Sequence, residues 1–74
     1  MVMKVTLNRS GRTTGGSSYL TQMVRAFNKG ATSIYFVVST GEKQQEVVDK
    51  IKFLALCLEE FKGNSLRITV TKEL

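Results

Sequence analysis

The residues most able to bind or react with a ligand lie in one polar run, residues 8–18, which contains no apolar side chain. From Gly11 this run has the outline of the phosphate-binding motif G-x4-G-K-[ST], but Ser17 stands where the essential lysine belongs. Nucleotide hydrolysis is therefore excluded, and the chain is also far too short for the nucleotide-hydrolase fold. Glycines still let backbone N–H groups approach an anion beside an electropositive helix start. We expect an anion site formed by five residues: Arg9, Arg12, Gly15, Gly16 and Ser17.

The positive charge of the chain is concentrated near its N-terminus. The net charge is +5, and residues 1–30 contain five cations and no acid. Such an asymmetry favours a polyanionic partner, although solubility alone is the alternative explanation. In the nucleic-acid interpretation Lys4, Arg25 and Lys29 extend the field of the loop arginines along the phosphates. Tyr19 could stack on a base, but an aromatic side chain at a helix start more often belongs to the core. We therefore expect largely sequence-independent binding to DNA or RNA.

Several classes of chemistry are excluded by composition. The chain has no histidine and one cysteine, Cys57, so it lacks the usual zinc ligands, a disulfide and histidine-based catalytic triads. Its acids between residues 42 and 60 alternate with lysines, and Glu46 and Lys50 are four apart, as on a solvated helix face. We predict a protein that is not an enzyme and needs no metal or cofactor. With no membrane span or signal segment and a lone cysteine, we expect it in the cytoplasm.

The pattern of apolar residues predicts five elements. Residues 2–7 alternate between apolar and polar side chains, which indicates a strand with one buried face. After the loop, Ser17 or Ser18 caps a helix with one apolar stripe, which ends at Gly30. The stripe consists of Leu20, Met23, Val24 and Phe27. Residues 34–38 are an uninterrupted β-branched and aromatic run, which predicts a central strand covered on both faces.

The second half repeats the helix-then-strand order. Ser39 and Glu42 have the spacing of a capping box, which predicts a helix that runs to about Lys62 and stops at Gly63. Its core stripe consists of Val47, Ile51, Leu54, Leu58 and Phe61. Alternation over residues 66–71 predicts a third strand. The order β-α-β-α-β implies a single α/β domain over residues 1–74. Its parallel strands would be joined by right-handed crossovers, with both helices on one face of a small sheet, in two layers.

Three residues fall outside the core stripe of the second helix. Phe53, Leu56 and Cys57 make that helix apolar around much of its circumference. They either meet the first helix or form a subunit interface. A domain of this size buries a thin core, which favours self-association as a homodimer. The same surface leaves open a second function, in which the chain is a regulatory or inhibitor module that binds a protein partner.

Two families share residue patterns with this chain. The stretches F-N-K-G-A-T-S-I-Y-F-V-V at 27–38 and E-V-V-D-K-I at 46–51 resemble the Alba superfamily of small nucleic-acid-binding proteins. The opening V-M-K-V-T-L-N-R-S is similar to its bacterial branch, which includes stage V sporulation protein S. The resemblance implies a dimer that binds DNA or RNA through the loop before the first helix, where Arg9 and Arg12 lie. The chain departs from the family in its longer loop and in ending after the third strand, without the hairpin arm.

The second resemblance is to the histidine-containing phosphocarrier protein of sugar transport. Residues 49–68, which contain D-K-I and F-K-G-N-S-L-R-I, align with that family. Its activity requires a histidine at the first helix, and this chain contains none. Phosphocarrier activity is therefore excluded, and a regulatory relative that acts on a protein partner is the form this resemblance leaves open.

Overall fold

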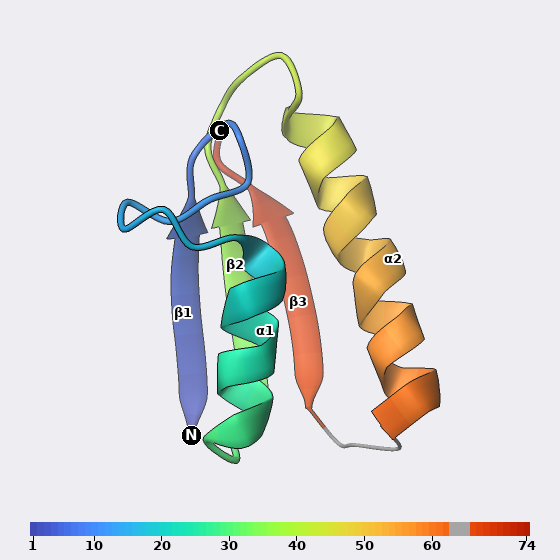
Figure 1. Ribbon diagram of the computed structural model, residues 1–74. Coiled ribbons are helices and arrows are strands. Elements are labelled where there is room, and N and C mark those ends of the chain that lie inside the picture. Colours follow the sequence, from blue (N-terminus) through green and yellow to red (C-terminus); the bar gives the residue numbers. More distant parts are fainter. Residues whose placement is uncertain (63–65) are drawn as a thin grey trace.

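The fold is a three-stranded sheet with two helices packed on one side of it (Figure 1). This computed structural model describes residues 1–62 and 66–74, without the side chains of residues 59–62. The elements in chain order are β1 (Val2–Leu7), α1 (Tyr19–Asn28), β2 (Ser33–Val38), α2 (Gln44–Lys62) and β3 (Arg67–Lys72). The predicted order β-α-β-α-β is confirmed, as is its α+β arrangement of a small sheet and two helices.

All strand pairs are parallel, and their register aligns the apolar side chains in rows. The strand order is β1-β2-β3, so β2 is central, and Val5, Phe36 and Val70 are aligned across the sheet. The side of the sheet under the helices contributes Leu7, Ile34 and Phe36 to the core, each fully buried. Full burial of one such side chain stabilises the fold by about 1.5–3 kcal/mol. The helices complete the core with Met23, Ala26, Val47, Val48 and Ile51.

The opposite side of the sheet carries no helix within the part of the chain described. The prediction that β2 is covered on both faces is therefore wrong, although its central position is confirmed. Ile34, Phe36 and Val38 are buried, whereas Ser33, Tyr35 and Val37 are only half-buried. The two sets alternate because successive side chains of a strand point to opposite faces. Their neighbours on β1 and β3, not a second layer, shield the half-buried set.

Helix α1 begins and ends much as the sequence predicts. The Ser18 hydroxyl accepts a hydrogen bond from the Thr21 amide, which satisfies one free donor of the first turn. Gly30 follows the helix with φ of +73°, a conformation that side chains rarely adopt. The predicted apolar stripe is only partly buried, because Met23 and Ala26 face the sheet. Leu20, Val24 and Phe27 remain 44%, 46% and 38% exposed.

Helix α2 begins later than the capping box predicts. It starts at Gln44, whose side-chain amide donates to the carbonyls of Val38 at 3.0 Å and Glu73 at 2.9 Å. Ser39 does not cap the helix, because it lies five residues before Gln44. Its amide instead continues the β1–β2 ladder by donating to the Leu7 carbonyl at 2.9 Å. The last residue of α2, Lys62, agrees with the prediction. Gly63 and the side chain of Phe61 lie outside the described residues.

None of the helices within residues 1–62 and 66–74 combines the length and the apolar character needed to cross a membrane.

Candidate nucleic-acid interface

The tip of the glycine-rich loop is a small hairpin. Thr13 donates its amide to the Ser17 carbonyl at 2.8 Å, and Gly16 donates to the Thr13 carbonyl at 2.9 Å. Arg12 and Ser18 form an isolated antiparallel bridge below this turn. Gly16 has φ of +88°, as the left-handed position of a three-residue hairpin loop requires. The long polar run therefore forms an arm with its own hydrogen bonds, which in Figure 1 projects sideways past β1 at the carboxyl end of that strand.

The base of this arm is organised by Asn8, which the sequence reasoning missed. Its side-chain oxygen accepts hydrogen bonds from the amides of Ser10 at 2.8 Å and Arg12 at 3.1 Å. The Asn8 carbonyl also accepts from Gly11 at 2.9 Å. Asparagine forms this kind of side-chain turn readily, so an asparagine directly after a strand was the available signal. The turn fixes the direction in which Arg9 and Arg12 leave the sheet.

The loop amides that were expected to cradle an anion are largely engaged within the chain. Gly16 donates to Thr13, and the Ser17 amide donates to the Thr13 hydroxyl at 3.2 Å. The Tyr19 amide at the start of α1 donates to the Gly11 carbonyl at 3.2 Å. The Gly15 amide forms no hydrogen bond with any residue the structure describes. An anion at this loop would therefore meet mainly arginine side chains rather than a ring of free amides.

Arg9 and Arg12 lie in different surroundings. The Arg12 guanidinium donates from Nη1 to the Gly16 carbonyl at 2.9 Å, which holds it along the hairpin. Arg9 instead packs on Gly41, because a Cβ placed on that glycine would lie 2.9 Å from the Arg9 Cβ. This contact joins the segment after β1 to the segment after β2. It makes Arg9 part of a hollow of about 590 Å³ at the carboxyl ends of these two strands.

The hollow beside Arg9 has mixed charge. It is lined by Arg9, Ser10, Gly41, Glu42, Lys43, Glu46, Val47 and Lys50. Glu46 and Lys50 form an exposed ion pair at 3.2 Å, a contact worth about 0.3–0.5 kcal/mol. Arg9 and Lys43 are the two cations of the hollow outside that pair. Lys43 was not predicted as a site residue. Its signal was topological, since the carboxyl ends of adjacent parallel strands meet at one edge of a sheet.

The other predicted cations do not converge on this hollow. Lys4 lies on β1, on the face opposite the helices, because Val5 and Leu7 alternate with it and are buried. Arg25 and Lys29 are exposed and four residues apart at the end of α1. The five N-terminal cations therefore occupy three places: the open side of β1, the loop, and the last turn of α1.

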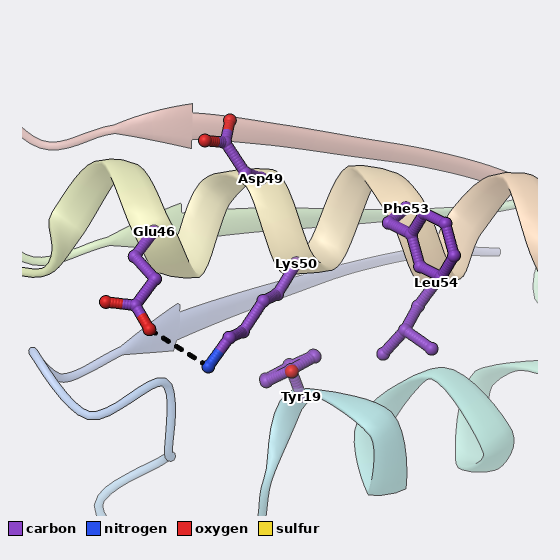
Figure 2. Close-up of a pocket in the computed structure, with 6 residues that line it drawn as sticks. All are labelled: Tyr19, Glu46, Asp49, Lys50, Phe53 and Leu54. Carbon is purple, nitrogen blue, oxygen red and sulfur yellow. Dashed lines mark ion pairs between the residues drawn. The ribbon is translucent and has the colours of Figure 1, made fainter.

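Tyr19 lies between the two helices rather than on the loop. It is half-buried and packs against the core. Figure 2 shows it beneath Lys50, Phe53 and Leu54 of α2, in a groove of about 620 Å³. Its ring is thus a wall of the groove between the helices, which matches the core interpretation of an aromatic residue at a helix start.

Two of the three expected interface residues of α2 are exposed, and these two do not share one hollow. Phe53 is 66% exposed and lines the groove towards Tyr19. Leu56 is 63% exposed and lines a different hollow, together with Ile68 and Val70 on the side of β3. Cys57 is a half-buried free thiol. The three residues form a ridge with one apolar hollow on each side.

Among residues 1–62 and 66–74, no three histidine, cysteine, aspartate or glutamate side chains are grouped as metal ligands would be. Comparisons of the chain with protein-family models, curated proteins and solved structures give no match. The resemblances to the Alba superfamily and to phosphocarrier proteins therefore rest on the quoted residues alone.

Proposed function

We propose that this chain binds the phosphate backbone of nucleic acid, DNA or RNA, largely without regard to sequence. The observation that carries the proposal is the charge of β1, the loop and α1. Their cations are exposed and no acid occurs within residues 1–30. They are Lys4, Arg9, Arg12, Arg25 and Lys29. In Figure 1 the acid-bearing helix α2 lies beside β3, at the opposite edge of the sheet from β1. Most of the basic segment, residues 1–30, is thus separated from these acids, although Arg9 lines the hollow that also contains Glu42 and Glu46.

Arginine side chains are the main contacts that we assign to the loop. Arg12 leaves most of its guanidinium donors free after its bond to Gly16. Arg9 is held by its packing on Gly41 and reaches the hollow that also contains Lys43. Phosphate contacts of this kind fix position on the nucleic acid but carry no sequence information. This supports binding that depends on salt more than on sequence.

A gel-shift titration at two salt concentrations tests the proposal, using one DNA and one RNA duplex. Affinity should fall steeply with salt. On the DNA duplex, Arg9→Ala with Arg12→Ala should reduce the slope of log K against log salt by about 2, at about 0.9 per phosphate contact. The matched control is Lys52→Ala with Lys72→Ala, which removes the same charge outside the basic segment. Absence of binding at low salt, or equal effects of the two double variants, would refute the proposal.

A second candidate function is binding to protein, which one specific observation favours. Large apolar side chains are exposed on both helices: Leu20, Val24, Phe27, Phe53 and Leu56. Scattered apolar residues are normal on a surface, whereas an apolar groove such as the one that Tyr19, Phe53 and Leu54 line between the helices marks an interaction site. We propose that a second copy of the chain covers this surface and forms a homodimer. A regulatory or inhibitor module with a different protein partner is the alternative.

A cytoplasmic location is also proposed, supported by the unpaired Cys57.

A further inference from the structure

The open side of the sheet presents a compact array of side chains that neither the loop nor the helices use. The strand register arranges nine side chains in three rows: Val2, Ser33 and Arg67, then Lys4, Tyr35 and Thr69, then Thr6, Val37 and Thr71. Tyr35 occupies the centre of this array. It is half-buried, while Lys4 and Thr69 on either side of it are exposed. The Tyr35 side chain is therefore partly shielded by its neighbours and partly open to solvent.

A bare face is unusual for this kind of sheet. All three strands are parallel, and parallel sheets occur almost only with both faces covered. Here the helices cover one face alone within the described residues. The exposed array is therefore a candidate binding surface, and its side chains indicate which class of ligand it would bind.

The array is basic and hydroxyl-rich rather than apolar. It contains two cations, Lys4 and Arg67, and no acid. Four of the remaining positions carry serine or threonine hydroxyls, groups that commonly bond phosphate and sugar oxygens. A second copy packed face to face would bring lysines and arginines together without a carboxylate to pair them. The positive charge of the array therefore favours a polyanion as its ligand. The central aromatic ring favours a polyanion with exposed flat bases, on which it can stack.

We propose that the open sheet face is a platform for single-stranded nucleic acid, on which Tyr35 stacks against one base while Lys4 and Arg67 contact the flanking phosphates. This inference rests on the proposed function and adds to it a preference for unpaired bases. Bases in a duplex are stacked on one another, whereas single strands expose faces on which aromatic side chains stack. Stacking needs no hydrogen bonds to base edges, so it agrees with sequence-independent binding.

The spacing of the three residues suits this arrangement. Lys4 lies one strand from Tyr35 in the same row, which places their Cα atoms about 5 Å apart. Arg67 lies one strand away on the other side and two residues back, at about 8 Å from the geometry of a sheet. Both side chains are long and flexible, so their charged ends reach phosphates on either side of a base held over the ring.

The test uses a Tyr19→Phe background, in which Tyr35 is the sole tyrosine of a chain without tryptophan. A 12-nucleotide oligothymidylate should quench the tyrosine emission, and the same strand paired with oligoadenylate should bind without quenching it. Tyr35→Thr should weaken single-strand binding by about 5- to 150-fold, the range that one stacked base contributes. Tyr35→Phe should retain affinity, because the ring remains.

Controls separate this inference from the proposed function. If the unmodified protein binds neither oligonucleotide at low salt, the proposed function itself fails. If it binds both with steep salt dependence, but Tyr35→Thr changes nothing and emission stays constant, the platform alone is refuted. Concentration-dependent quenching without nucleic acid would assign the face to a second copy and also overturn it. If Tyr35→Thr loses its circular dichroism signal, a double variant that keeps the ring, Lys4→Gln with Arg67→Gln, replaces it. This variant should weaken single-strand binding more than the control, Lys52→Gln with Lys72→Gln, and equal effects would refute the platform.

Discussion

The position of the basic loop depends on Gly11, and its substitution by alanine tests the loop structure most directly. Gly11 has φ of +79°, so any side chain there is strained by about 1–2 kcal/mol. The residue is also buried against α2. An added Cβ would lie 3.3 Å from Cγ1 of Val47 and 3.4 Å from Cδ2 of Tyr19. Only the Val47 contact is shorter than an ordinary van der Waals distance, so the cost lies at about 1–2 kcal/mol, in the lower part of the range for overpacking. The free energy of unfolding should therefore fall by about 2–4 kcal/mol.

Gly16→Ala is the matched control for this substitution. Gly16 has φ of +88°, but a Cβ there would meet no atom within 4 Å, so only the backbone strain applies. Both substitutions restrict the unfolded chain alike, and that contribution cancels in the comparison. Gly11→Ala should thus cost about 1–2 kcal/mol more than Gly16→Ala, a difference in Tm of roughly 4–8 °C per kcal/mol in a domain of this size.

Urea unfolding followed by circular dichroism measures both variants. A chain of 74 residues has about 4–11 kcal/mol of total stability, so both losses lie within range. Equal losses in the two variants would show that Gly11 does not pack on α2. The argument that the arm is fixed against the helix would then be refuted, and with it the assigned direction of Arg9.

Two further predictions concern the base of the arm and the exposed ridge of α2. Asn8→Ala should lower the free energy of unfolding by about 1–2 kcal/mol, since two amides lose their acceptor, whereas Asn8→Asp should keep the stability and weaken nucleic-acid binding. Equal destabilisation of both in urea would contradict the side-chain turn. Phe53→Ser should leave the stability within about 0.5 kcal/mol and lower the molar mass in sedimentation from dimer to monomer, whereas Val2→Ser should not. A monomeric unmodified protein, or a dimeric Phe53→Ser variant, would refute the interface.

The elements were predictable because apolar residues at periods of two and 3.6 specify strands and helices locally. The helix boundaries were less so, since Ser39 has the residue type of a cap but extends the β1–β2 ladder with its amide. That choice depends on a partner strand distant in sequence. Likewise, four apolar residues of α1 predict one stripe, yet the small Ala26 turns a different side of the helix to the sheet. Only the packing of the whole chain decides between these alternatives.

The candidate site illustrates the same limit. The sequence located Arg9 and Arg12 correctly in the loop after β1, but not the internal bonds that engage the amides of Gly16 and Ser17. It also suggested a doubly covered β2, because an uninterrupted apolar run does not distinguish a second layer from shielding by neighbouring strands. That prediction covered residues 34–38 as a whole and did not single out Tyr35. Its true setting emerges only from the register, which places Lys4 beside it.

The two proposed contact surfaces, the loop and the open sheet face, should affect binding differently: one through its dependence on salt, the other through its preference for single strands. Strand β1 connects the two surfaces. Lys4 and Thr6 both lie on the open face, and the strand then continues directly into Asn8 and Arg9. Arginine contacts from the loop contribute salt dependence to single and double strands alike, because both carry phosphates. A stack on Tyr35 contributes affinity to single strands alone and leaves the salt slope unchanged, because a ring neutralises no charge. If both surfaces act on one molecule, loop variants should change the slope and Tyr35→Thr the intercept, and a combined variant should show both changes independently.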